Sequence, residues 1–440
     1  NIGSGTLVAS TDSPFDDPEG FQFGEEGDQN IIKCGSYEGN NADDGTEVFL
    51  GWEPSLLLIK SVDTADDWVI FDNLRGMTVD GVNDEALFPN KTDTEAGGNY
   101  LAPTSTGFKL TTQSDRVNNN STYIYMAIRR PDGLVGKPAE AGTNAFAMDY
   151  GVDASVSIPC FDSGFPVDIA MYRNPTSTSD NYVGVRLIGP REIYTNDNPG
   201  DSSFVHMTYD YMDGFRKTGS TSLLAWMWKR GAGCDVITYN GNGAIRDIPH
   251  SLGRTPEMMW IKRRDTGGNN WQVYHKGLNG GTNPEQYYMY LNTTAPETSQ
   301  YAIDSWNHTA PTATHFTLGT DGNVNNGSSG RTYMAMLFAS VDGISKVGYY
   351  TGNGSTQTIT TGFSPRFAII RRTDGSEDHW LVLDTTRGWV SGNDKGLKLN
   401  SNSAQGTSED YGAPTSTGFS LTSNGWVNYN TGTYIYYAHA

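Results

Sequence analysis

The residues of this 440-residue chain best suited to bind a ligand are aromatic side chains in its polar, variable stretches. Four stand out: Tyr287, Tyr288, Trp306 and Tyr411. Aromatic ring faces suit the C–H faces of sugars, and loops on a rigid scaffold carry recognition more often than strands do. We therefore predict these four as ligand-binding residues.

Three tryptophans recur at one place in a repeating pattern and allow two interpretations. Trp68, Trp271 and Trp380 each begin a short apolar run. Their rings are suited to stack on sugars, but a large aromatic within an apolar run more often packs in a core. Core packing is the favoured interpretation.

Two acid–base pairs share a spacing of three residues, Asp72 with Arg75 and Asp384 with Arg387. A catalytic role would require a nucleophile or a second acid nearby. We predict instead that each pair ties a strand end to the following turn. The sequence contains no serine-nucleophile elbow, phosphate-binding loop or dinucleotide fingerprint. With 50 acidic residues some facing carboxylates are inevitable, so the sequence assigns no glycosidase pair, and we predict no catalytic residues.

Two Asp- and Asn-rich segments, residues 40–45 and 321–327, resemble calcium loops. In the second, the glycine falls one place late and position twelve is Thr332 rather than glutamate, so it does not meet the EF-hand pattern. We predict an Asn/Gly hairpin turn there. The seven histidines show no metal-binding spacing. We expect no metal site and no cofactor, with loop-bound calcium left open as an alternative.

Composition limits the classes of partner. A formal net charge of −20 argues against nucleic acid and against an anionic membrane surface. No apolar run is long enough to span a bilayer, so we expect no membrane insertion. Cys34, Cys160 and Cys234 are odd in number and far apart, which predicts buried thiols rather than disulfides or a zinc site.

One segment defines the organisation of the chain. Residues 102–108 recur letter for letter as residues 413–419, and looser versions end at Phe215 and Phe316. The phenylalanines that end successive versions of the segment lie 101 to 107 residues apart. This period indicates tandem small domains. We interpret the segment as a framework position where each variable loop rejoins the sheet, rather than as a site.

The elements of each copy follow one order. A proline opens a short apolar run that ends in a basic residue, which predicts a strand buried on both faces. An aromatic-led strand, a variable polar loop, the Gly-Phe pair and a final aromatic strand follow. No segment shows a sustained 3.6-residue apolar period. We predict an all-β protein of four tandem antiparallel β-sandwich modules, of jelly-roll or lectin-like type and about 100 residues each. The opening runs are residues 54–60, 166–173, 256–262 and 365–371, and the polar loops are residues 80–100, 192–203, 279–304 and 391–411.

The predicted boundaries follow from these copies. Short junctions lead us to expect that adjacent repeats touch, and we expect a natural end at Ala440, where the last strand of the fourth copy ends. The parts are an acidic N-terminal arm or connector (residues 1–27), repeat 1 (28–133), the divergent repeat 2 (134–230), repeat 3 (231–343) and repeat 4 (344–440).

Four strings carry a resemblance to a known family: residues 226–230, 337–343, 350–354 and 434–440. They resemble a repeat of unassigned function found in structural proteins of tailed bacteriophages, marine ones notably. The resemblance covers residues 28–440 and implies a lectin-like sandwich in a tail-fibre or virion protein, with no catalytic residues to transfer. Repeat 2 departs most, because it lacks a clear tryptophan and an Arg-Gly step.

These observations favour a non-enzymatic virion structural protein on the exterior of the particle. The first expectation is a tail-fibre, spike or appendage component that contacts the host surface through its variable loops. Its expected partners are other virion proteins, further copies of itself (a trimer) and a host surface glycan, but not nucleic acid. The alternatives are a capsid-decorating or connecting protein and a polysaccharide depolymerase.

Overall fold

The computed structural model describes residues 31–79, 84–131, 139–153, 155, 157–203, 207–231, 233–299, 305–328 and 330–440. The predicted arm at residues 1–27 lies outside them. The chain divides into two compact units, Asn1–Lys137 and Pro138–Ala440. Repeat 1 falls within the first unit and repeats 2 to 4 within the second, apart from a few residues at the junction. The number of modules and their boundaries stay predictions.

The described part of the chain is all-β, as predicted, with antiparallel strand pairs throughout its sheets. Its α-helices are single turns, α1 (Gly322–Asn325) and α2 (Gly425–Asn428). The chain also makes short 3₁₀ turns at Gly142–Asn144, Arg186–Ile188, Leu278–Gly281 and Pro284–Gln286.

In the first unit a four-stranded sheet and a three-stranded sheet share one core, and a bridge from Ile70 to Leu87 joins a two-stranded ribbon to the larger sheet. In the larger sheet, the last strand of the repeat lies between the first strand of the repeat and the strand formed by the opening apolar run. This sheet therefore forms only when the two ends of the repeat come together. The larger sheet is β1 (Ile32–Glu38), β9 (Thr122–Arg129), β3 (Pro54–Ser61) and β4 (Val69–Asp72). The smaller sheet is β2 (Glu47–Phe49), β8 (Gly107–Leu110) and β7 (Leu101–Thr104), and the ribbon is β5 (Asp84–Ala86) with β6 (Ala96–Gly98).

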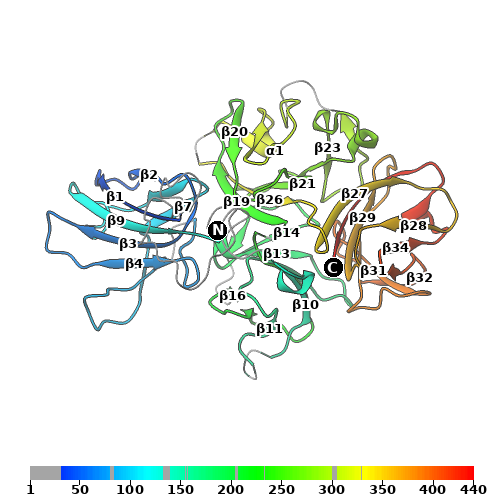
Figure 1. The fold of residues 1–440 in the computed structure, drawn as a ribbon, viewed down its shortest axis with the longest axis horizontal. Coiled ribbons are helices and arrows are strands. Elements are labelled where there is room, and N and C mark those ends of the chain that lie inside the picture. The colour runs from blue at the N-terminus through cyan, green and yellow to red at the C-terminus, as the bar shows by residue number, and fades with distance from the viewer. Residues whose placement is uncertain are drawn as a thin grey trace, which may run out of the picture. The chain divides into compact units, whose positions relative to one another are not determined.

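The second unit contains three six-stranded sheets with one strand order, each accompanied by a smaller sheet. Figure 1 shows the three groups of strands around a common centre. In repeat 2 the large sheet is β10 (Phe146–Tyr150), β18 (Leu224–Trp228), β12 (Ile169–Arg173), β13 (Tyr182–Val185), β14 (Arg191–Tyr194) and β15 (Ser202–Ser203), and the small one is β11 (Phe161–Asp162), β17 (Gly214–Lys217) and β16 (Met207–Thr208).

Repeats 3 and 4 follow the same order. In repeat 3 the large sheet is β19 (Cys234–Asn240), β26 (Thr332–Phe338), β21 (Met258–Arg263), β22 (Gln272–His275), β23 (Tyr287–Tyr290) and β24 (Thr298–Ser299), and the small one is β20 (Arg246–Pro249) with β25 (His315–Leu318). In repeat 4 the large sheet is β27 (Ser345–Thr351), β35 (Thr433–His439), β29 (Phe367–Arg372), β30 (Leu381–Asp384), β31 (Asp394–Lys398) and β32 (Gly406–Glu409), and the small one is β28 (Gln357–Thr360), β34 (Gly418–Leu421) and β33 (Pro414–Thr415).

The opening apolar runs form the predicted strands, but they differ in burial. Every residue of strands β12 and β21, in repeats 2 and 3, is buried. In repeat 4 only the last residue of strand β29 is partly exposed. In β3 of repeat 1 buried and half-buried residues largely alternate. The expectation of a strand buried on both faces is therefore wrong for repeat 1, where one side of the sheet faces outward.

The repeated Gly-Phe pair is a framework position, as predicted. The phenylalanines of the three Gly-Phe pairs, and Phe316, which follows His315 in repeat 3, are 0% exposed. A Cβ atom on Gly107, Gly214 or Gly418 would collide with a backbone carbonyl oxygen of the paired strand. Glycine recurs there because the two backbones approach too closely for a side chain.

We expect Gly418→Ala to lower the free energy of unfolding by about 1–3 kcal/mol, because the added methyl group would meet the carbonyl oxygen of Ile359. The matched control is Gly425→Ala, since no atom lies within 4 Å of a Cβ there. Denaturant unfolding of both variants checks the prediction, which a Gly418→Ala protein as stable as the control would contradict.

Two other expectations about local structure are wrong. The polar loops contain short strands, β5 and β6 in repeat 1 and β31 and β32 in repeat 4, whose sequences lack apolar alternation and which are held by pairing with their neighbours. Within residues 321–327, Gly322–Asn325 form helix α1 rather than a hairpin turn. The side chain of Asp321 caps this helix by accepting a hydrogen bond from the backbone N–H of Asn323 at 2.6 Å.

The cysteines follow the prediction in two cases out of three. Cys160 and Cys234 are buried, whereas Cys34 is exposed on β1. The exposed residues of β1 lie on the same side of the sheet as the half-buried Leu56 and Leu58 of β3. Cys34 thus belongs to a surface that the sequence suggested would be covered.

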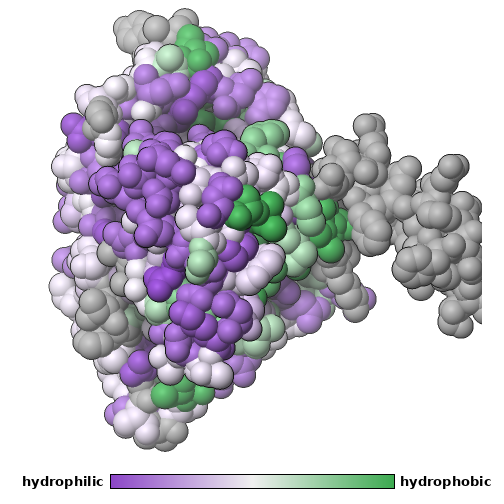
Figure 2. Space-filling model, turned by 90° about the vertical axis from the view of Figure 1, so that its left-hand side faces the viewer, coloured by the Kyte–Doolittle hydropathy of each residue, from purple (hydrophilic) through white to green (hydrophobic). Residues whose placement is uncertain are grey.

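The face drawn in Figure 2 is mainly hydrophilic, with separate hydrophobic side chains among the polar ones. In the first unit the most exposed large apolar side chains include Phe49, at 70%, and Val62, at 53%. None of the helices in the described part of the chain is long and apolar enough to cross a membrane.

Candidate functional site

The four aromatic residues predicted to bind a ligand do not form one site. Trp306 is 1% exposed and Tyr411 is 5% exposed, and each belongs to the hydrophobic core of its repeat. The expectation that these two lie in exposed loops is wrong, because their loops fold back and place the rings in the core. Tyr287 and Tyr288 are partly exposed on strand β23, and Tyr288 packs against the core of repeat 3.

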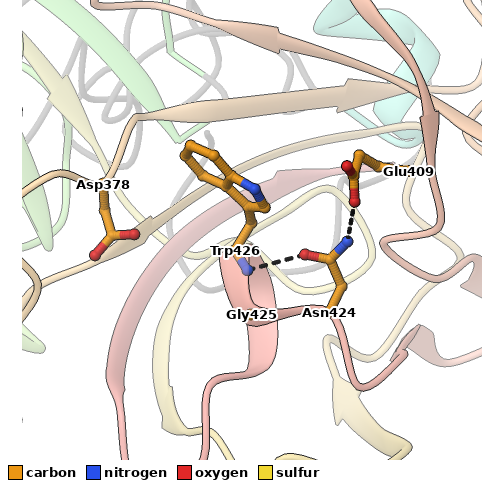
Figure 3. A pocket seen from close by; sticks show the side chains of 5 residues that line it. All are labelled: Asp378, Glu409, Asn424, Gly425 and Trp426. Carbon is orange, nitrogen blue, oxygen red and sulfur yellow. Dashed lines mark hydrogen bonds between the residues drawn. The ribbon is translucent and has the colours of Figure 1, made fainter.

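An open hollow in repeat 4 is the best candidate site in the described part of the chain (Figure 3). It has a volume of about 300 Å³ and is lined by Asp378, Glu409, Asn424, Gly425 and Trp426. Asp378 comes from the turn between β29 and β30, Glu409 ends β32, and the other three belong to the start of α2. In Figure 3 the indole of Trp426 stands between Asp378 on one side and the Glu409–Asn424 pair on the other.

Asn424 organises the hollow. Its side-chain oxygen accepts a hydrogen bond from the backbone N–H of Trp426 at 2.9 Å, which caps helix α2. Its amide nitrogen donates to Oε2 of Glu409 at 2.7 Å. One side chain therefore fixes both the start of the helix and the orientation of the acid.

The Trp426 ring is half-buried and has basic neighbours. The Nζ atom of Lys398 lies 4.7 Å from the ring centroid, and the ring of His379 stacks on it at 5.7 Å. Burial lowers the pKa of His379 below its usual value, with Lys398 adding to the effect. Burial also raises the pKa of the Asp378 carboxyl, against the opposing charges of Arg371 and Arg372.

This arrangement suits a ligand that combines an apolar face with hydroxyl groups. Trp426 supplies a partly exposed aromatic surface, and the carboxylates of Asp378 and Glu409 accept hydrogen bonds. Saccharides carry both features. Of the residues that the structure describes, no cluster of three or more His, Cys, Asp or Glu could hold a metal ion.

The prediction of core packing is confirmed for two of the three recurring tryptophans. Trp271 and Trp380 are buried, at 0% and 1% exposure. Their indole N–H groups donate to carbonyl oxygens of the neighbouring repeat, Tyr194 at 2.7 Å and Tyr290 at 3.0 Å, so both residues also join one repeat to the next. Trp68 is 36% exposed, so core packing is wrong for that residue.

The divergent repeat 2 makes the same contact with a different side chain. The strand registers place Asn181 where repeats 3 and 4 have their tryptophans. The amide nitrogen of Asn181 donates to the carbonyl oxygen of Lys398 in repeat 4 at 3.1 Å. Tyr194, Tyr290 and Lys398 are themselves equivalent in register, so the three contacts close a ring: repeat 2 to repeat 4, repeat 4 to repeat 3, and repeat 3 to repeat 2.

A buried cation strengthens each contact of this ring. Arg173, Lys262 and Arg371 stand at one register position and are 0% exposed. Burial lowers the pKa of Lys262 to about 8 and those of both arginines to about 10. The acceptors, at 2.8 to 3.3 Å, are the carbonyl oxygens of Ser401, Asn402 and Ser403 for Arg173, of Asn198 for Lys262, and of Thr294 and Ala295 for Arg371.

Backbone hydrogen bonds join the repeats at a third equivalent position. In each bond, a backbone N–H in the polar loop of one repeat donates to a carbonyl oxygen of a neighbouring repeat. The residue that accepts lies two places after the buried cation of that repeat. The bonds are Asp201 N–H to the Arg264 carbonyl oxygen (2.8 Å), Glu297 N–H to that of Thr373 (2.7 Å) and Gln405 N–H to that of Pro175 (2.8 Å). Three independent contacts therefore obey the same threefold relation.

The predicted acid–base pairs tie strand ends to turns, as expected. Asp72 accepts from the backbone N–H of Arg75 at 2.9 Å and pairs with its side chain at 2.6 Å. Asp384 and Arg387 do the same at 2.8 and 2.6 Å. The first pair is 22% exposed on each side, but the second is fully buried, where Trp226 of repeat 2 also donates to Asp384 at 3.0 Å.

An asparagine that was not predicted as a functional residue recurs in all four repeats, two residues after the acceptor position. The side-chain oxygen of each accepts the backbone N–H of the tryptophan, or of Asn181, at 2.7 to 3.1 Å. The four are Asn90, Asn196, Asn292 and Asn400. A search for single residues repeated inside the variable loops would have found them.

Trp426 was missed for the opposite reason. The residue before the repeated Val-Asn pair is Arg116 in repeat 1, Asn323 in repeat 3 and Trp426 in repeat 4. A position that changes within an otherwise repeated framework is the signal that could have found it.

Comparison with known proteins places the chain in a family without assigning an activity. No curated protein matches it. A family model described as "Domain of unknown function (DUF7483)" matches residues 28–130 and 217–440. The matched parts leave out most of repeat 2, where Asn181 replaces the tryptophan. The chain belongs to the DUF7483 family.

Proposed function

We propose that this chain is a non-enzymatic structural protein of a bacteriophage virion, a tail-fibre, spike or appendage component that contacts the host surface through its loops. The observation that carries the proposal is the ring of contacts in the second unit. The repeated side chains of the framework, such as Arg371, Trp380 and Asn400, donate hydrogen bonds that join one repeat to the next. Such use of repeated residues serves assembly, and the sequence resemblance to virion proteins points the same way.

The hollow at Trp426 supports the host-contact part of the proposal. It is built at a framework position whose residue differs between repeats, on the short helix α2. Its aromatic surface and acidic acceptors suit a host surface glycan. Other virion proteins and further copies of the chain are the remaining proposed partners.

Imaging of native particles tests the main proposal. We expect antibodies against the chain to label the tail or an appendage of purified particles, and its peptides to be found in them by mass spectrometry. Labelling spread over the head shell would favour a capsid-decorating protein. Absence from particles would refute the virion proposal.

Trp426→Ala is expected to weaken binding to host surface glycan by about tenfold or more, because it removes the aromatic surface of the hollow. The matched control is Asn323→Ala, at the same framework position in repeat 3. Binding of both variants to a glycan array and to host cells checks the prediction. Equal binding by the two variants would contradict it.

A depolymerase is the second candidate, favoured by one observation: the carboxyls of Asp378 and Glu409 line the same hollow. Incubation with host polysaccharide tests it. Release of new reducing ends that is lost in Asp378→Asn and Glu409→Gln would replace the non-enzymatic proposal, whereas binding without release supports it.

A further inference from the structure

We propose that the outer face of sheet β1–β9–β3–β4 in the first unit binds two further copies of this chain, so that three first units close a ring like the one formed by repeats 2, 3 and 4. The inference does not depend on the proposed function. A protein outside any virion would assemble in the same way.

The proposed interface is an apolar sheet face whose side chains are partly exposed. Ile32 is 42% exposed, Ile124 is 39% exposed and Trp68 is 36% exposed. Strand pairing places further half-buried side chains on the same side of the sheet: Leu56, Leu58, Ile70, Met126 and Ile128. Contiguous exposed apolar surface on a soluble protein commonly marks an interaction site.

In the second unit the equivalent face is the centre of the ring. The registers align Leu58 with Trp260 and Ile369, and Ile128 with Phe338. There the rings of different repeats pack together, for example Trp228 on Phe367 at 5.6 Å and Phe338 on Tyr437 at 5.0 Å. These residues are at most 2% exposed. The same framework therefore already shows what covers this face: two further copies of itself.

The first unit retains the donors of the ring contacts. Lys60 stands at the register position of Lys262 and Arg371, and Trp68 at that of Trp271 and Trp380. Lys60 donates to the carbonyl oxygens of Ser61 and Thr64 in its own turn. Since an ammonium group has three donors, one remains for a neighbour. Lys262 shows the same division, with one bond to its own Asn269 and one to Asn198 of the next repeat.

The first unit also retains the acceptors. Its bridge between Ile70 and Leu87 places Phe88 at the position of Tyr290 and Lys398, and Asn90 binds the backbone of Trp68 as its equivalents do. The exposed Thr92 lies four residues after Phe88. The equivalent residues Asn198 and Thr294 accept hydrogen bonds from the buried cations through their carbonyl oxygens. In the trimer Trp68 of one copy donates to the Phe88 carbonyl of the next, and Lys60 to that of Thr92.

The second unit shows how these donors and acceptors are used. There, each repeat donates to one neighbour and accepts from the other, and we expect the first units of different copies to pair in the same head-to-tail way. A head-to-tail interface of this kind closes into a ring when its rotation allows. In the second unit the same framework closes after three members, which fixes the expected number.

We expect light scattering of the full-length chain to give three times its mass of 47.9 kDa. Trp68→Ala and Lys60→Glu are each expected to raise the monomer fraction at least tenfold while far-UV circular dichroism stays unchanged. The matched control, Phe49→Ser, removes an aromatic side chain that is 70% exposed on the small sheet and is expected to leave the trimer intact. A chain that is monomeric at high concentration, or a trimer that survives both variants, would overturn the proposal.

A disulfide tests the geometry directly. Val62 and Glu95 stand where Thr373 and Glu297 share an inter-repeat backbone hydrogen bond of 2.7 Å. A backbone bond of this kind holds the two Cα atoms about 5–6 Å apart, within reach of a disulfide. In a Cys34→Ala background, the double variant Val62→Cys with Glu95→Cys is expected to give a covalent trimer on a non-reducing gel. Dithiothreitol should reduce this trimer to monomers. Each single variant is the control, and exclusively intrachain linkage would refute the interface.

Discussion

Replacing Arg387 with methionine is expected to lower the free energy of unfolding of the second unit by about 3–5 kcal/mol. The Nε atom of Arg387 lies 2.6 Å from Oδ2 of Asp384, and both side chains are 0% exposed. Arg387 also donates to the carbonyl oxygens of Lys395 and Val382. The variant leaves the Asp384 carboxylate buried beside Trp226 without its charged partner. An uncompensated buried charge destabilises the folded state strongly.

The matched control is Arg331→Met. Arg331 pairs with Asp265 at 3.0 Å, but its side chain is 34% exposed and Asp265 keeps Arg263 as a second partner. We expect a loss of about 0–1 kcal/mol there. Adding Asp384→Asn to Arg387→Met is expected to recover part of the loss, because a neutral amide replaces the buried charge. Denaturant unfolding, with hydrogen exchange to assign the affected unit, measures all three. Equal losses in the two arginine variants would contradict the prediction.

Acid is expected to destabilise the second unit through two buried histidines, His275 and His439. Both are at most 1% exposed, and burial lowers the pKa of each to about 3. The unfolded chain takes up a proton on each near pH 6.5, whereas the folded protein does not until about pH 3. Stability therefore falls as pH drops through this window, by about 3 kcal/mol per histidine at pH 4.5 relative to pH 7.

Burial is the main cause of the low pKa of His275, and its hydrogen bonds identify the neutral tautomer. Its Nδ1 atom accepts from the backbone N–H of Gly277 at 2.9 Å, and its Nε2 atom lies 3.2 Å from the carbonyl oxygen of Tyr436 in repeat 4. These two contacts match the tautomer that carries its proton on Nε2. Protonation would place a charge on Nδ1 facing an N–H group, in a site that excludes water.

His275→Gln is designed to keep the donor toward Tyr436 while removing the titration. We expect it to lower the stability at pH 7 moderately and to flatten the loss between pH 6.5 and 4.5. His315→Gln, whose side chain is 37% exposed, is the control and should leave the pH profile unchanged. Unfolding free energies across this pH range check both. A His275→Gln profile as steep as that of the parent chain would refute the assignment.

Much of the fold was predictable because local patterns carry it. The apolar run at residues 367–371 forms most of β29. The run at residues 433–440 forms β35, which ends one residue earlier, at His439. The Gly-Phe pair marks a close backbone approach in repeats 1, 2 and 4, whereas repeat 3 has His315 at the glycine position. Strands such as β6 and β32 were missed because they hold Gly, Ser, Thr and Glu without alternation, and only pairing with a neighbour makes them strands.

The candidate site was much less predictable. Trp306 and Tyr411 lie in polar stretches of sequence, yet their loops carry them into the core. Trp426 lies in a framework segment, yet the turn of α2 presents it at the hollow. Sequence position alone does not say which way a loop folds, because that depends on residues far away in the chain.

Local features of the sequence are enough to predict a β-protein built on one repeated framework, since strand period, turn residues and the recurring glycine act locally. The roles of the repeated residues become visible only in the folded chain. Lys60 and Lys262, or Trp68 and Trp380, occupy equivalent positions, yet the members of each pair differ in burial. Within the second unit, neighbouring repeats cover Lys262 and Trp380. Burial of a sheet face depends on which other surface meets it, and that is a property of the assembled chain rather than of any segment.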